Sequence, residues 1–188
     1  DGNALGQSDA YTHIYGAGNM SRIEPEGGHE GTRNLAMHKM GASEGEVSGN
    51  EDKTKQDGRA NYAFVQQMTD DNYARQVQDA WKGVPGAGDA TNEAERNHSS
   101  IIQMGGDYNM AETYQFGDDN YVDIMQYGTE NVAITDQGIW DQERPSATGM
   151  EASHGDDNFI SIYQEGMGQM THVIQKGFSN SATVTQTP

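Results

Sequence analysis

The feature that most constrains the fold of this chain is the recurrence of side-chain carboxamides with a period of eleven residues. Asn120 follows Gln115 after five residues and Gln126 follows after six more, and then Asn131 and Gln137 repeat the same two steps. A disordered chain has no reason to keep such a regular spacing, so the period indicates an internal repeat that folds.

Each repeat is a unit of seven residues that starts with Asn or Gln and ends with Gln. In the unit NYVDIMQ (120–126), small or aliphatic residues alternate with aromatic, charged or mixed ones. A period of two is typical of a β-strand with one buried face. We therefore expect Asn120, Val122, Ile124 and Gln126 to point inward, and the residues between them to face solvent.

The connectors between units are mostly four residues long, with glycine in second place. A tight turn at that place favours the positive φ that glycine tolerates. The predicted turn glycines are Gly58, Gly117, Gly128, Gly166 and Gly177. Two strands and two turns make a coil of about 22 residues, and stacked coils give two facing parallel sheets. The predicted fold is all-β, a flattened parallel β-solenoid of about seven coils.

In such a stack, equivalent residues of successive coils lie about 4.7–4.9 Å apart. Carboxamides at that spacing can donate and accept along the axis, so we predict structural amide ladders in an amyloid-like cross-β arrangement. The predicted ladder residues are Asn61, Gln67, Asn72, Gln78, Asn97, Gln103, Asn109, Gln115, Asn120, Gln126, Asn131, Gln137, Asn158, Gln164, Gln169, Gln175, Asn180 and Gln186.

The repeats are unevenly kept along what we expect to be a single solenoid domain. The internal prolines, Pro25, Pro85 and Pro145, avoid every well-kept repeat, as expected because proline cannot donate to a ladder. The predicted segments are degenerate N-terminal repeats with insertions at 1–49, good repeats at 50–78, 97–137 and 158–188, and degenerate strands or loop insertions at 79–96 and 138–157.

Composition narrows the possible functions. The chain has 188 residues, 33% of them hydrophobic, a net charge of -18 and no cysteine. Disulfides and thiolate metal sites are therefore excluded, and no apolar run is long enough to span a membrane. The acidic balance disfavours binding to nucleic acid. The six histidines are scattered without ligand spacing, so we expect no metal and no cofactor.

Paired aspartates recur in the connectors, where stacking would bring like charges together. We expect them to act as gatekeepers that slow premature assembly. These carboxylates are Asp70, Asp71, Asp118, Asp119, Asp156 and Asp157. Calcium binding is the alternative, and we favour solvated carboxylates because Ca²⁺ requires six to eight oxygens from a preformed loop.

The segments NMAETYQFGDDNYVDIMQYGTENVAITDQ (109–137) and NFISIYQEGMGQMTHVIQKGFSNSATVTQ (158–186) resemble the curlin repeat family, the subunits of bacterial curli amyloid fibres. The chain looks like a longer, divergent member. The resemblance implies a secreted protein whose signal peptide is already removed, exported unfolded through an outer-membrane secretion channel. It further implies a homopolymer started by a nucleator subunit, forming extracellular cell-surface fibres that build biofilm matrix and mediate adhesion.

The last well-kept unit, NSATVTQ, supplies the expected assembly end, formed by Asn180, Ala182, Val184 and Gln186. An exposed coil is a template for the first coil of another copy, and a contact that does not close gives a filament. Four aromatic residues occupy equivalent outward positions: Tyr62, Tyr73, Tyr121 and Phe159. We expect them to form either an aromatic ladder or ordinary contacts between coils.

Alternative functions remain open. The chain could be the minor, nucleating subunit, or a monomeric solenoid that binds a surface or acts on polysaccharide. An enzyme of that kind is generally longer and gathers carboxylates on one coil face. A surface-binding solenoid requires a regular threonine face, whereas threonine here is sporadic. We therefore expect no enzymatic activity.

Overall fold

The computed structural model describes residues 9–26, 34–41, 47–57, 60–79, 96–137 and 157–188. Strands are the only regular elements in these ranges, as the alternating patterns predict. They are β1 (Asp9–Ile14), β2 (Gly16–Ala17), β3 (Met20–Glu26), β4 (Leu35–Met40), β5 (Val47–Ser48), β6 (Glu51–Asp57), β7 (Tyr62–Gln67), β8 (Tyr73–Asp79), β9 (His98–Met104), β10 (Met110–Phe116), β11 (Tyr121–Thr129), β12 (Val132–Gln137), β13 (Phe159–Met167), β14 (Met170–Gln175) and β15 (Ser181–Gln186).

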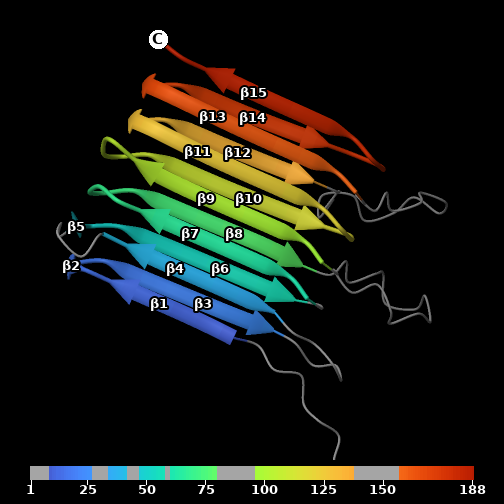
Figure 1. Cartoon of the computed structure of the whole chain (residues 1–188), viewed down its shortest axis with the longest axis horizontal. Coiled ribbons are helices and arrows are strands. Elements are labelled where there is room, and N and C mark those ends of the chain that lie inside the picture. Colours follow the sequence, from blue (N-terminus) through green and yellow to red (C-terminus); the bar gives the residue numbers. More distant parts are fainter. Residues whose placement is uncertain (1–8, 27–33, 42–46, 58–59, 80–95, 138–156) are drawn as a thin grey trace, which may run out of the picture.

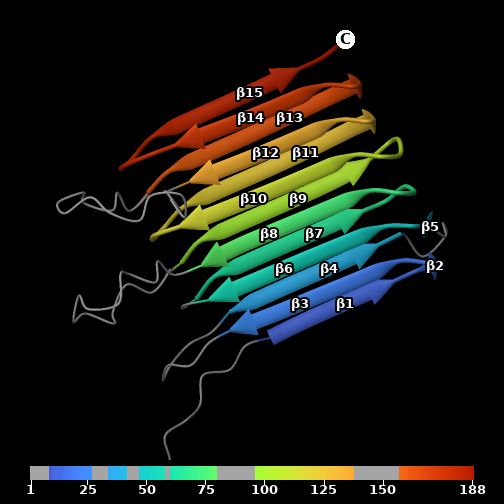
Figure 2. The same cartoon turned by 180° about the vertical axis from the view of Figure 1, so that it is seen from behind.

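Two parallel sheets face each other along the whole stack (Figures 1 and 2). The seven-stranded sheet has the order β1-β4-β7-β9-β11-β13-β15, and the six-stranded sheet has the order β14-β12-β10-β8-β6-β3. The chain alternates between the two sheets, so one coil is one strand from each. The short strands β2 and β5 pair beside them. The predicted flattened parallel β-solenoid is confirmed.

The register does not slip along the stack. Gln115 of β10 pairs with Gln137 of β12, 22 residues later, and Gln78 of β8 pairs with Gln115, 37 residues later. The longer interval contains residues 80–95, which lie outside the described residues. The connector is therefore longer here, but the amides stay aligned. This is expected because a slip by one residue would turn every inward side chain outward.

The N-terminal strands belong to the same two sheets. β1 is the edge strand of the seven-stranded sheet and β3 the edge strand of the six-stranded sheet. Pro25 lies within β3, an edge position at which a missing backbone N–H is tolerated.

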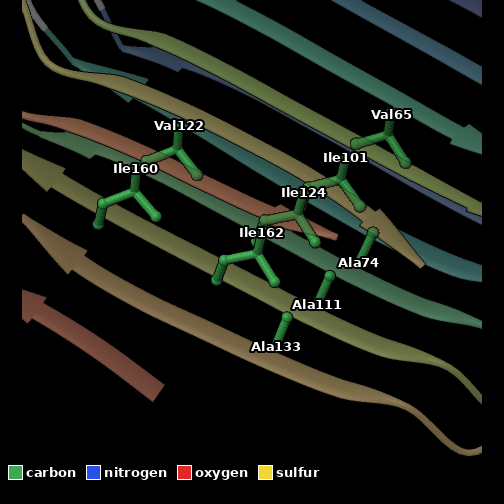
Figure 3. Close-up of a cluster of buried hydrophobic side chains, with 9 residues drawn as sticks. All are labelled: Val65, Ala74, Ile101, Ala111, Val122, Ile124, Ala133, Ile160 and Ile162. Atoms are coloured by element: carbon green, nitrogen blue, oxygen red, sulfur yellow. The ribbon is translucent and has the colours of Figure 1, made fainter. Parts of the chain in front are cut away.

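The apolar core is a narrow column between the sheets (Figure 3). Val65, Ile101, Ile124 and Ile162 come from the seven-stranded sheet, and small residues such as Ala111 come from the strands that face it. Large side chains thus meet small ones, which fills a thin interior at close packing. This narrowness explains how a chain with 33% hydrophobic residues can bury a core.

Candidate assembly site: the amide ladders

Two columns of glutamine run along the stack, one in each sheet, from β7 to β15 and from β6 to β14. In the seven-stranded sheet the Nε2···Oε1 distances are 3.0, 2.9, 2.9 and 2.9 Å along Gln67, Gln103, Gln126, Gln164 and Gln186. In the six-stranded sheet they are 3.0, 2.9, 3.0 and 3.2 Å along Gln56, Gln78, Gln115, Gln137 and Gln175. Except for the two end rungs, Gln175 and Gln186, which are 6% exposed and half-buried respectively, these side chains are almost completely buried.

Both glutamine columns have one direction. Each of these amides donates Nε2 to the Oε1 of the next coil towards β15, without a reversal in either sheet. A column of this kind has an acceptor end and a donor end. The donor end is at Gln186 and Gln175.

The same amides also connect the two sheets. Gln126 Nε2 donates across the core to the carbonyl oxygen of Met110 at 2.9 Å, and Gln115 Nε2 donates to that of His98 at 2.9 Å. The bond recurs along the stack, and at the donor end Gln186 donates to Met170 and Gln175 to Phe159. The glutamines thus bind coil to coil and sheet to sheet.

The asparagine columns combine the expected amide-to-amide bonds with bonds to the main chain. The amide bonds join Asn109 to Asn72 at 3.0 Å, Asn158 to Asn120 at 3.0 Å and Asn180 to Asn158 at 2.9 Å. Asn97 Oδ1 accepts the main-chain N–H of Asn120 at 3.0 Å, and Asn97 Nδ2 donates to the turn carbonyl of Gly117 at 2.7 Å. The same main-chain bond joins Asn131 to Asn109 and Gln169 to Asn131, each at 3.1 Å. Because asparagine is one methylene shorter than glutamine, its oxygen stays close to the backbone and aligns the start of the next strand.

The turn glycines adopt the expected conformation where they are described. Gly117, Gly128, Gly166 and Gly177 have φ of 105, 124, 123 and 90°. Gly58 lies outside the described residues. A carbon added at Gly128 would overlap the carbonyl oxygen of Gly166 on the next coil, so this turn requires glycine for space as well as for φ.

A second left-handed position escaped the sequence analysis, because glycine marks it only sporadically. The residue immediately before each column asparagine has positive φ even where it carries a side chain. The side-chain-bearing residues at this position are Ala60, Asp71, Arg96, Tyr108, Asp119, Glu130, Asp157 and Ser179. Each such residue costs about 1–2 kcal/mol, which the asparagine bonds that follow it must offset.

The predicted gatekeeper carboxylates lie in turns and contact the turns of neighbouring coils. Asp119 receives two hydrogen bonds from Arg96, at 2.7 and 2.6 Å, and these bonds lower the pKa of its carboxyl group. Asp70 Oδ1 accepts from the Ser48 N–H at 2.8 Å, and the Asp157 N–H donates to the Asp118 carbonyl at 3.1 Å.

Asp71 occupies one of the left-handed positions, and Asp156 lies outside the described residues. No group of three or more potential metal ligands occurs within the described ranges. The gatekeeper role concerns chains before assembly and stays a prediction.

An aromatic column covers the outer face of the seven-stranded sheet, with a different membership from the one expected. Tyr62, His98, Tyr121 and Phe159 stack with centroid distances of 4.7, 4.5 and 5.2 Å. Tyr73 does not join them, because β8 belongs to the other sheet. Burial in this stack lowers the pKa of His98.

A buried polar cluster near the N-terminal coils was also missed. His38 Nδ1 lies 2.7 Å from Asp52 Oδ1 and 2.8 Å from Ser21 Oγ, and His38 Nε2 lies 2.7 Å from Thr54 Oγ1. The side chains of His38 and Asp52 are completely buried. Alternation does place both residues inward, but a pair on different strands becomes visible only after stacking.

The expected assembly end is the open edge of the seven-stranded sheet. Ala182 and Val184 of β15 are partly buried against the core, and Asn180 and Gln186 are half-buried at the two ends of the strand. In the six-stranded sheet the corresponding edge strand is β14.

The comparisons agree with this architecture. The family model of the curlin associated repeat matches residues 117–139 and 155–187. The chain carries curlin associated repeats. The matched segments contain the five strands from β11 to β15, and the coils further towards the N-terminus continue the same stack. The curlin repeat points to a curli-type structural subunit.

Searches of curated proteins and of solved structures found no match. Within the described ranges, no helix is long and apolar enough to cross a membrane.

Proposed function

We propose that this protein is a structural subunit of extracellular curli-type amyloid fibres, joined head to tail through the ends of its solenoid. The fibres build biofilm matrix at the cell surface and mediate adhesion. The family likeness further suggests export through an outer-membrane secretion channel and a nucleator subunit that starts the fibre.

The observation that carries this proposal is the single direction of the glutamine columns. At the β14 and β15 edge, Gln175 and Gln186 keep their cross-sheet bonds. Among the described residues, neither amide donates to a further glutamine along the axis. A donor end fits an acceptor end and does not fit another donor end. The contact is therefore heterologous, and such contacts propagate into filaments when rotation does not close them.

The turn carboxylates would control the rate of this assembly rather than its direction. Stacking brings turns of successive coils within about 5 Å, well inside the Debye length of about 8 Å at physiological salt. Asp118, Asp119 and Asp157 lie in adjoining turns, so assembly of a chain with a net charge of -18 gathers negative charge. Salt or lower pH should therefore accelerate fibre formation.

The test compares two lysine substitutions in the same edge strand. Val184 points inward on β15 and Thr185 is exposed on the outer face, so Val184→Lys and Thr185→Lys add the same charge to opposite sides. The unchanged protein should form thioflavin-positive fibres with a meridional reflection near ~4.7–4.8 Å. Val184→Lys should stop elongation of preformed seeds, and Thr185→Lys should elongate almost normally. A persistently soluble monomer, or equal elongation by both variants, would contradict the proposal.

A further inference from the structure

Both glutamine columns stop at the same level of the stack. The Oε1 atoms of Gln56 in β6 and Gln67 in β7 are buried and have no hydrogen-bond partner among the described residues. The residues paired with them on the preceding strands are Pro25 in β3 and Met40 in β4. Neither residue type has a carboxamide, so neither column has a side-chain amide donor at this level.

This boundary separates the first strands of each sheet from the rest of the solenoid. β1 and β4 precede β7 in one sheet, and β3 precedes β6 in the other. We call β1, β3 and β4, together with the short β2 that joins β1 to β3, the N-terminal cap. Removing it would expose β6 and β7 together, with both unsatisfied acceptors on the new edge.

His38 gives the cap a polar side chain in a row where the next coils have apolar ones. His38 of the cap meets Asp52 and Thr54 of β6, at the inward position held by Val65 and Ile101 in the next two coils. Asp52 Oδ2 is buried there and has no hydrogen-bond partner among the described residues. Buried acceptors left unpaired weaken an interface, so the cap is held less well than an ordinary coil.

The exposed end of the stack matches the covered edge residue for residue. The inward side chains of β15 are Asn180, Ala182, Val184 and Gln186. Those of β7 are Asn61, Ala63, Val65 and Gln67, the same four residue types in the same order. In β4, the strand that now covers β7, the set is Asn34, Ala36, His38 and Met40.

We propose that the edge of β6 and β7 is the docking surface for β14 and β15 of a second copy of this chain, and that docking displaces the N-terminal cap. Gln186 and Gln175 of the incoming copy would donate to Gln67 and Gln56, which completes both columns. This inference rests on the proposed head-to-tail assembly and specifies the surface that receives it.

The order of the strands supports the displaced arrangement. β15 ends one copy in the seven-stranded sheet, and β6 begins the next in the six-stranded sheet, so the two sheets continue to alternate. With the cap in place, β1 would follow β15 in the same sheet, and the level above β14 would lack a strand. Displacement therefore leaves no unpaired edge inside the fibre.

Cysteine cross-linking distinguishes the two junctions, because the chain has no native cysteine. Tyr11, Met37 and Phe64 occupy one outward row, to which Thr183 of β15 also belongs. Adjacent parallel strands are separated by about 4.8 Å, which lies within disulfide range. Thr183→Cys should therefore cross-link to Phe64→Cys if β15 stacks on β7, and to Tyr11→Cys if it stacks on β1.

Equal mixtures of the full-length single-cysteine proteins are assembled and oxidised, and the linked peptides are identified by mass. We expect the 183–64 link in several-fold excess over the 183–11 link. A dominant 183–11 link would overturn the displaced cap and leave head-to-tail assembly standing. Fibres with neither link would overturn this docking surface as well. If no fibres form with the unchanged chain, the proposed function fails, and this inference fails with it.

A second measurement strengthens the cap instead. Met40→Gln supplies the missing donor opposite Gln67 Oε1, and Met37→Gln makes the same change on the outer face of β4. A gained bond of average strength should slow seeded elongation by on the order of tenfold in Met40→Gln alone. Equal elongation rates for the two variants would overturn the proposal.

Discussion

Replacing Gln126 with methionine tests whether the glutamine columns stabilise the stack. Its carboxamide accepts from Gln103 at 2.9 Å and donates to Gln164 at 2.9 Å. It also donates across the core to the carbonyl oxygens of Met110, at 2.9 Å, and Asn131, at 3.0 Å. Methionine has a similar length and no amide, so the substitution removes the bonds and nearly keeps the volume.

The magnitude follows from those four bonds. At about 0.5–1.5 kcal/mol each, their loss costs roughly 2–6 kcal/mol, and it leaves Gln164 Oε1 buried without its axial donor. The added apolar surface of methionine returns about 1 kcal/mol. We therefore expect the free energy of unfolding to fall by about 3 kcal/mol, or the soluble concentration at equilibrium with fibres to rise about a hundredfold.

The measurement is equilibrium denaturation in guanidinium, followed by the β-sheet circular dichroism signal. Gln66→Met is the matched control, because Gln66 lies beside the column on the outer face and its amide donates to the sulfur of Met68 instead of to a column glutamine. The control should stay within about 0.5 kcal/mol of the unchanged chain. A loss in Gln126→Met as small as that of the control would refute the structural role of the amides.

Three further changes test the turns and the charges. Gly128→Ala should lower stability by more than about 3 kcal/mol, because its methyl group would meet the Gly166 backbone. Gly177→Ala has open space and should cost only the left-handed strain of about 1–2 kcal/mol. Thermal denaturation compares the two variants. Ala60→Gly should raise stability by about 1 kcal/mol, because φ of 53° costs glycine little, and an unchanged or lower midpoint would contradict this. Burial raises the pKa of the Asp136 carboxyl, so the folded state keeps this proton to a higher pH than the unfolded chain does. The folded state therefore gains stability as the pH falls through the pKa of the folded state. Asp136→Asn should therefore raise the denaturation midpoint at pH 7 and flatten its pH dependence, whereas an equal gain at every pH would argue against this assignment.

The strands could be predicted from the sequence because both signals that define them are local. The unit 120–126 contains its alternation and both of its amides, and β11 begins one residue after Asn120. The register of stacking follows from the same unit. Each carboxamide must meet the equivalent carboxamide of the next coil, and one register alone allows this. This explains why Gln78 and Gln115 remain aligned although 37 residues separate them.

The remaining features depend on contacts that no local pattern contains. Tyr108 and Glu130 are left-handed although neither residue favours that conformation, because each is held between a turn and the asparagine that follows. His38 and Asp52 fall at inward positions of units that resemble eroded repeats. Their polar character argues against burial until the coils are stacked and each side chain meets its partner.

The distribution of polar chemistry explains how a strongly acidic chain can favour a stack. The side-chain bonds of the glutamine columns come from carboxamides, which carry no net charge, so each rung of a column gains a hydrogen bond without burying an ion. Charges gather instead in turns such as those of Asp119 and Asp157, at the surface where salt screens them. Attraction and repulsion thus act through different residues. In the proposed fibre, substitutions at glutamines such as Gln126 would therefore change stability, and substitutions in the turns would change the rate of growth.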